Sequence, residues 1–330
     1  MMLDIVGKRY WFFLLSILVL VPGVISLVLP GGLRPGIDFT SGSIMTIQFD
    51  KSVNQSDLRN EFTTLGHPEA MVQKSDSGIP GGSTFIVRTY TLKGEQKDAS
   101  GKVTAPAERE SIQNALIKKF GNMKMLSFDS VSPIIATETV RNAVVAVAGA
   151  AVGILLYIAY AFRRVKSSFR WGTCAVIALV HDALVVLGVF SILGRFFDVE
   201  VDSLFITAVM TIIGFSVHDT IVVFDRIREN YGRRMGDRFE NVVNHSIMQT
   251  IGRSLNTSLT VLLVLVTLFL FGGVTIKTFV LALLIGIVTG TYSSIFVAAS
   301  LLVVWENGEL KKGWQRLFGG NSKRAASPAN

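Results

Sequence analysis

Six long apolar segments limit what this chain of 330 residues can fold into. Crossing the hydrocarbon core of a bilayer takes roughly 20 apolar residues in a helix, and every backbone polar group must be hydrogen-bonded within the spanning structure. The segments that meet this requirement are Tyr10–Leu29, Ala143–Phe162, Trp171–Leu193, Ser203–Phe224, Ser254–Phe271 and Thr278–Trp305. The sequence therefore predicts an α-helical polytopic membrane protein with six transmembrane helices.

The positions of the cationic residues predict which side of the membrane each loop occupies. The chain has a net charge of +8, and short loops rich in Lys and Arg stay on the cytoplasmic side. Cations gather in four places: Lys8 and Arg9; Arg163, Arg164, Lys166 and Arg170; Arg226, Arg228, Arg233, Arg234 and Arg238; and Lys311, Lys312, Arg316, Lys323 and Arg324. The intervening loops, Gly194–Asp202 and Gly272–Lys277, are short and poor in cations. We therefore expect both termini to be cytoplasmic and residues Leu33–Thr137 to lie outside the cytoplasm.

The segment between the first two apolar runs has the pattern of an α+β domain. Strands are predicted at Ile44–Phe49, Met71–Lys74, Thr84–Thr91 and Lys124–Val131, and helices at Asn54–Leu65 and Pro106–Phe120. A turn is expected at Gly78–Gly82, and the charged stretch Lys93–Thr104 is expected to be a loop. The order β-α-β-β-α-β predicts a ferredoxin-like arrangement, with two helices on one face of a four-stranded antiparallel sheet.

These patterns divide the chain into four parts. We assign residues 1–30 to a cytoplasmic N-terminus and the first helix, and 31–137 to the extracytoplasmic domain. Residues 138–306 hold helices two to six, and 307–330 form a basic cytoplasmic tail. A cleavable signal peptide is an alternative for the first helix. Its length favours a span instead, and Val24-Ile25-Ser26 is a poor cleavage site.

Ionisable residues inside the apolar segments are the candidate functional groups. A carboxylate at the centre of a transmembrane helix costs about 3 kcal/mol, so it normally faces a partner or a wet cavity. Asp219 lies in the fourth segment beside His218, and Asp182 lies beside His181 in the third. Arg253 stands at the entrance to the fifth segment and is followed by Asn256, Thr257 and Thr260, which together make a polar stripe. An arginine that moves relative to Asp219 would switch the carboxylate between holding and releasing a proton.

These charges also have a purely structural interpretation. They could form a static buried ion pair that fixes helix register. The two histidines are the weaker candidates, because an isolated histidine in a helix is more often hydrogen-bonded to a nearby carbonyl.

Other chemistries have little support in the sequence. It contains no P-loop, dinucleotide-binding glycine pattern, HExxH or GxSxG motif, and its four histidines have no metal-ligand spacing. We expect no enzyme activity, no metal and no cofactor. The basic patches are explained by topology, so a nucleic-acid partner is not expected. Gly149 with Gly153, and Gly286 with Gly290, have the spacing that allows helices to approach closely.

Four motifs resemble those of the SecD/SecF family. Gly36, Asp38, Phe39 and Gly42 follow the first helix in a run similar to the family's GxDFxGG motif, with Ser43 taken as a replacement for the second glycine. The other three are the fourth-helix run Ile213–Asn230, the fifth-helix run Arg253–Ser258 and the third-helix run Leu179–Asp182. His218 stands where the family often has Asn.

The resemblance implies a function in protein export. Family members of this size belong to the resistance-nodulation-division superfamily and work in the bacterial cytoplasmic membrane. They act with SecD beside the SecYEG channel, where the proton-motive force promotes translocation of secreted chains. By resemblance, Asp219 and Arg253 occupy the positions tied to proton transfer, with Asp182, His181, His218 and Asn256 as further candidates. The expected partners are a six-helix SecD-like subunit, SecYEG, unfolded exported polypeptide and membrane lipid. Protons are the coupling ion.

Two alternatives belong to other classes. A small-molecule exporter of the same superfamily would usually have twelve helices and two large outer domains, so the single outer domain here disfavours it. A passive assembly subunit would use Asp219 and Arg253 only to hold the helices in register.

Overall fold

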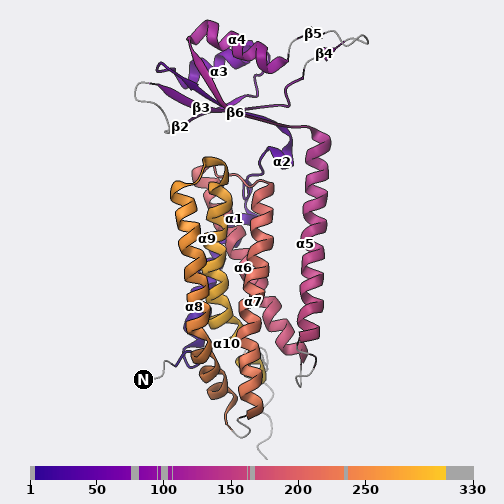
Figure 1. Ribbon diagram of the computed structural model, residues 1–330, viewed down its shortest axis with the longest axis vertical. Helices are drawn as coiled ribbons and strands as arrows, with labels where there is room; N and C mark the ends of the chain where they lie inside the picture. Colours follow the sequence, from indigo (N-terminus) through magenta and orange to yellow (C-terminus); the bar gives the residue numbers. More distant parts are fainter. Residues whose placement is uncertain are drawn as a thin grey trace, which may run out of the picture. The chain divides into compact units, whose positions relative to one another are not determined.

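The computed structural model describes residues 4–75, 82–94, 96–97, 103–105, 107–161, 163, 168–233 and 237–309. They form two compact units (Figure 1). One unit comprises Pro35–Val144, and the other comprises Met1–Arg34 together with Val145–Asn330. Residues 78–81 of the expected turn and the basic tail beyond Glu309 lie outside the described residues.

The unit of Pro35–Val144 is built on a four-stranded antiparallel sheet with the order β2-β3-β1-β6. Its main elements are β1 (Gly42–Phe49), α3 (Gln55–Thr64), β2 (Met71–Ser75), β3 (Ser83–Thr89), α4 (Glu108–Phe120) and β6 (Met123–Val131), after a short α2 (Ile37–Thr40). Alternate residues of the strands, such as Met45 and Phe85, are buried with Leu58 of α3 and Leu116 of α4. Both helices thus pack on one face, which confirms the ferredoxin-like fold.

Two local expectations in this unit can be compared with the structure. The cap predicted at Asn54 is present, because its side chain accepts a hydrogen bond from the backbone N–H of Ser56 at 3.2 Å. The stretch Lys93–Thr104 is more than the expected loop, since β4 (Gln96–Lys97) and β5 (Val103–Ala105) pair as a two-stranded sheet. Val103 and Thr104 are β-branched and favour a strand despite the surrounding charge.

The other unit is a bundle of long helices, and among the described residues of the chain six helical spans are long and apolar enough to cross a membrane. They are α1 (Arg9–Val28), α5 (Pro133–Ala161), α6 (Ser168–Phe197), α7 (Ser203–Arg233), α8 (Phe239–Phe271), and a last span of α9 (Val274–Tyr292), the π-helix η1 (Ser293–Ala298) and α10 (Ala299–Glu306). α5 begins in the other unit. The six predicted spans are therefore confirmed.

Several helices extend beyond the apolar runs. α8 begins at Phe239, so Arg253 lies in the middle of a helix rather than at its start. The turns that precede the apolar run bury Val243 and Ile247 in the bundle core. This burial stabilises the helix beyond the length needed to cross the membrane. α5 begins at Pro133, ten residues before the predicted apolar run that starts at Ala143. A proline at the first helical position lacks only an N–H that would be unpaired there.

Glycines set the closest helix contacts. The Cα atoms of Gly23 in α1 and Gly188 in α6 face each other so closely that a Cβ on Gly188 would lie 2.7 Å from Gly23. Gly286 packs against Ile212 of α7, in agreement with the predicted close approach. A Cβ at Gly149 would meet nothing within 4 Å among the described residues. The spacing pattern therefore predicted the close contact at Gly286, predicted one at Gly149 that the described residues do not show, and did not indicate the contact of Gly23 with Gly188.

Candidate functional site

Asp219 is buried on the inner face of α7. Its side chain is 8 % exposed, and Oδ1 accepts a hydrogen bond of 2.6 Å from the hydroxyl of Ser254 on α8. The second oxygen, Oδ2, is buried and has no hydrogen-bond partner among the described residues. A carboxylate with so few donors is poorly stabilised when charged, so the site favours bound protons or a donor brought by another molecule.

Arg253 does not pair with Asp219 in this structure. Its side chain is exposed, and among the described residues its guanidinium makes no hydrogen bond or ion pair. Asn256, Thr257 and Thr260 are also exposed, so the predicted polar stripe lies on the outer face of α8. The residue that reaches Asp219 is Ser254, one position further along and 2 % exposed. A static Asp219–Arg253 pair is therefore absent from the described part of the chain.

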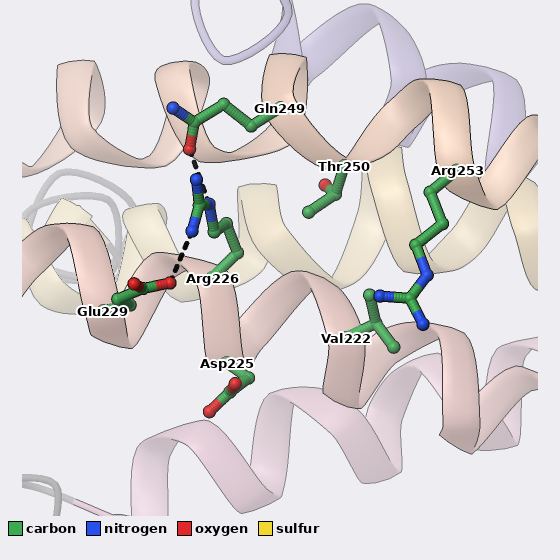
Figure 2. A pocket seen from close by; sticks show the side chains of 7 residues that line it. All are labelled: Val222, Asp225, Arg226, Glu229, Gln249, Thr250 and Arg253. Atoms are coloured by element: carbon green, nitrogen blue, oxygen red, sulfur yellow. Dashed lines mark hydrogen bonds and ion pairs between the residues drawn. The ribbon is translucent and has the colours of Figure 1, made fainter.

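Arg253 lines a cavity of about 320 Å³ between α7 and α8. Figure 2 shows Arg226 turned toward Gln249 and Glu229, whereas Arg253 extends alone beside Val222. The charges of Arg226 and Glu229 are balanced by their ion pair of 2.5 Å. Arg253 is thus the cation in this cavity that is free to meet an incoming anionic group.

Asp182 is the centre of a second buried cluster. Its side chain is fully buried in α6, and Oδ2 accepts hydrogen bonds from Ser216 at 2.5 Å and from Ser293 at 2.7 Å. Oδ1 lies 2.9 Å from Nδ1 of His181. The Nε2 atom of His181 is buried without a hydrogen-bond partner among the described residues. No Arg or Lys side chain pairs with this carboxylate in the described part of the chain, so its hydrogen-bond partners there are two serine hydroxyls and the His181 ring.

The π-helix η1 supplies serines that the sequence interpretation missed. Ser293 binds Asp182, and Ser294 bonds with Thr220 of α7 at 2.8 Å and with the carbonyl oxygen of Gly290 at 2.8 Å. A π-helical turn shifts the helical register, so it turns both serines toward the core. Sequence periodicity gave no sign of this shift. The sequence does contain a pattern that indicates a buried role for Ser254. Small hydroxyl residues recur every four positions on α8, at Ser246, Thr250, Ser254 and Ser258.

The remaining candidates of α7 lie on a different face from Asp219. His218, Thr207 and Thr211 are exposed. The hydroxyls of both threonines bond back to carbonyl oxygens one turn earlier in their own helix. His218 is therefore exposed on α7 and is not part of the buried network around Asp182.

The motif that follows the first helix forms a tight structural element. Gly36 precedes α2, which contains Asp38 and Phe39, and Gly42 begins β1 with φ of 125°. A Cβ on Gly42 would lie 2.7 Å from the carbonyl oxygen of Thr89, so this position requires glycine.

The departure from the family motif is at Ser41 and not at Ser43. Counting from Gly36 places the two adjacent motif glycines at positions 41 and 42. Ser41 has φ of 63°, in the left-handed region that favours glycine. Ser43 is a buried strand residue, and its hydroxyl accepts the backbone N–H of Leu92 at 3.0 Å.

Comparisons with known proteins agree with these motifs. Residues 111–308 match the family "Protein export membrane protein SecD/SecF, C-terminal", and residues 31–53 match the "SecD/SecF GG Motif". The chain is 50 % identical over 327 residues to protein translocase subunit SecF of Thermobaculum terrenum, covering 99 % of this chain and 100 % of the relative.

Some relatives are longer than this chain and match it over only part of their length. The chain is 36 % identical to protein translocase subunit SecDF of Bacillus subtilis, with 94 % of this chain and 39 % of the relative covered. The crystal structure of SecDF from Thermus thermophilus, a translocon-associated membrane protein, superposes with a TM-score of 0.76 at 30 % identity. That match covers 93 % of this chain and 39 % of the other, so the chain spans well under half of these SecDF proteins.

Proposed function

Because the chain belongs to the SecD/SecF family of protein export membrane proteins, we propose that it uses protons crossing the membrane to promote translocation of secreted polypeptides. It is a multi-pass membrane protein, and its role is in protein export. The coupling to protons, the orientation of the chain and the further partners are the parts that we propose here.

The main support for proton coupling is the carboxylate of Asp219, of which only one oxygen has a hydrogen-bond partner among the described residues. One oxygen has the Ser254 hydroxyl, and the other is buried without a hydrogen bond in the described part of the chain. Holding a charge there is costly, so Asp219 takes up a proton when no cation is near. A cation that approaches Asp219 from the outer face of α8 favours release of the proton from its carboxyl group. One proton moving through 100 mV releases about 2.3 kcal/mol, enough to shift a conformational equilibrium more than tenfold.

Asp182 and His181 are proposed as a second proton-holding pair. They share one buried cluster with Ser216, which lies on α7 three residues before Asp219. Any movement of α7 that changes the surroundings of Asp219 therefore also displaces a hydrogen-bond donor of Asp182. The two carboxylates are coupled through one helix, which supports a mechanism in which proton transfer and helix movement occur together.

The outer faces of α7 and α8 support a membrane partner. Polar residues that face lipid are costly, and this side of the bundle exposes polar or charged groups on both helices. The group comprises Thr207, Thr211, His218, Asp225, Arg253, Asn256, Thr257 and Thr260. We infer that a SecD-like subunit covers this face and contributes an acidic group to Arg253. The Bacillus subtilis SecDF relative, of which this chain matches 39 %, supports such a partner.

The distribution of cations supports a defined orientation. Cytoplasmic termini follow from the positive-inside rule, and they place the unit of Pro35–Val144 outside the cytoplasm of a bacterial cytoplasmic membrane. There it can meet an unfolded polypeptide leaving the SecYEG channel, with membrane lipid around the bundle. No cofactor is needed in this scheme, because protons are the coupling ion.

Substitution of Asp219 tests the proposal. Asp219→Asn keeps the size of the side chain and a hydrogen-bond acceptor for Ser254 but cannot exchange a proton. Inner-membrane vesicles holding the variant in its complete translocase should lose the stimulation of export by a proton gradient while keeping normal amounts of protein. Glu306→Gln is the control, because Glu306 is paired with Arg170 at 2.8 Å near the end of α10. Gradient-driven export at the unaltered rate in Asp219→Asn would disprove the role of Asp219.

A further inference from the structure

A buried histidine lies between two carboxylates in the unit of Pro35–Val144. His67 follows α3, and the residue is 8 % exposed. Its Nδ1 atom is 3.3 Å from Oε1 of Glu69, and its Nε2 atom is 3.3 Å from Oε1 of Glu108 at the start of α4. The ring therefore lies between two carboxylates, with a hydrogen bond to Glu69 and an ion-pair distance to Glu108, and Nε2 is buried without a hydrogen-bond partner among the described residues.

The same carboxylates hold the backbone around β4 and β5. Oε2 of Glu108 accepts the N–H of Lys93 at 2.7 Å, and the N–H of Glu108 donates to the carbonyl oxygen of Lys93 at 3.0 Å. Glu69 accepts the N–H of Tyr90, which follows β3, at 3.3 Å. Lys93 and Glu108 are the two ends of the segment that contains β4 and β5, which we name the β4–β5 arm.

The number of hydrogen bonds that His67 can donate depends on its protonation state. A neutral imidazole carries one N–H and presents a lone pair on its other nitrogen, whereas a protonated imidazole donates from both. With a neutral ring, one of the two carboxylates faces a lone pair at 3.3 Å and is repelled. With a protonated ring, both carboxylates accept charge-assisted hydrogen bonds.

Glu69, one of the two carboxylates beside His67, has a lowered pKa. Burial alone would raise the pKa of Glu69, but hydrogen bonds from its own backbone N–H, from Tyr90 and from His67 lower it below the ordinary value. Glu69 therefore stays ionised while an imidazole titrates. Among the described residues, the charged groups within ion-pair distance of His67 are Glu69, from the loop before β2, and Glu108, from α4. α3 and α4 are also joined by the Glu61–Lys119 ion pair, whose charges balance.

We propose that His67 is a proton-operated clamp that fixes the base of the β4–β5 arm when the surrounding solution is acidic and loosens it when the solution is neutral or alkaline. Protonation ties the α3–β2 loop to α4 through Glu69 and Glu108, and through them it ties down Tyr90 and Lys93. Loss of the proton breaks one of the two bridges. The clamp is independent of proton transfer at Asp219, since it lies in the other unit.

A nitroxide label beside the clamp tests this proposal. Gly94 is exposed, and a Cβ there meets nothing within 4 Å, so Gly94→Cys in a Cys174→Ala background places a label next to Lys93. The full-length protein in nanodiscs is titrated between about pH 5 and pH 8, where an imidazole exchanges its proton. We expect the label to be less mobile at the acidic end. His67→Gln should abolish this transition, and His245→Gln, at a histidine of α8, should retain it.

A second variant separates the clamp from a general effect on folding. Glu108→Gln keeps an acceptor for the N–H of Lys93 but removes one of the negative charges that stabilise the protonated ring. The mobility transition should therefore shift to lower pH. A pH transition that persists unchanged in His67→Gln, an absent transition in the parent protein, or an unshifted transition in Glu108→Gln would each overturn the proposal. Export assays with Asp219→Asn are unaffected by any of these outcomes.

Discussion

The hydroxyl of Ser254 on α8 donates a 2.6 Å hydrogen bond to Asp219 on α7, while the neighbouring Arg253 is exposed on the outer face of the same helix. A helix turns by about 100° per residue, so adjacent residues of α8 cannot both face Asp219. Ser254 is therefore the group that orients the carboxylate within this chain. Arg253 lies about 100° around the helix from Ser254 and lines the cavity that Val222 of α7 also lines.

Removing the Ser254 hydroxyl should slow gradient-driven export. Ser254→Ala leaves both oxygens of Asp219 without a donor among the described residues, and losing a hydrogen bond to a charged group costs about 1.5–3 kcal/mol. We expect a decrease of roughly tenfold in the stimulation of export by a proton gradient. Ser254→Thr retains the hydroxyl and should preserve most of it. Equal stimulation in Ser254→Ala and the parent protein would show that this bond does not orient the carboxylate.

The contact of Gly23 with Gly188 should be sensitive to a single added methyl group. Gly188→Ala places a Cβ 2.7 Å from Gly23 and must push α1 away from α6, which costs about 1–3 kcal/mol of unfolding free energy. Gly149→Ala is the matched control in another membrane helix, since a Cβ there meets nothing within 4 Å. Thermal unfolding in detergent should show a lower Tm for Gly188→Ala only. A similar Tm for both variants would argue against close packing at this contact.

Gly42→Ala should destabilise the unit of Pro35–Val144 for two reasons. The backbone has φ of 125°, and the new Cβ would lie 2.7 Å from the carbonyl oxygen of Thr89. We expect a loss of roughly 2–3 kcal/mol, the upper part of the range for strained backbone positions. Gly121→Ala also has a positive φ, of 90°, but open space around its Cβ. The difference in Tm between the two variants measures the clash alone, and a larger loss for Gly121→Ala would contradict this account.

Glu309 should stabilise the end of the bundle in a pH-dependent way. Burial would raise its pKa, but hydrogen bonds from Tyr10 and Asn307 and the charge of Arg9 lower it below the ordinary 4.5. A carboxyl with a lowered pKa in the folded state stabilises that state above its unfolded pKa, and this contribution is lost as the pH falls through the folded value. Glu309→Gln should lower Tm at pH 7 by an amount equivalent to about 1 kcal/mol. The difference from the parent protein should shrink below about pH 4.5, and a constant difference across this range would refute the assignment.

The sequence by itself determined the number of membrane spans and the order of elements in the unit of Pro35–Val144. Both depend on the hydrophobicity of short stretches and on local turn chemistry, which are read along the chain. The same local information identified Asp219 and Asp182, because a carboxylate in an apolar run is costly wherever the helices pack. It also predicted the cap at Asn54, whose hydrogen bond lies within two residues.

The tertiary structure alone decided which side chains meet. The selection of Ser254 over Arg253 depends on the rotation of α8 against α7, and the approach of Ser293 to Asp182 depends on the π-helical turn in the last span. The start of α8 at Phe239 depends on packing of Val243 and Ile247 in a core assembled from several helices. Helix rotation, register shifts and packed extensions arise from contacts between residues far apart in the chain, so no local pattern contains them.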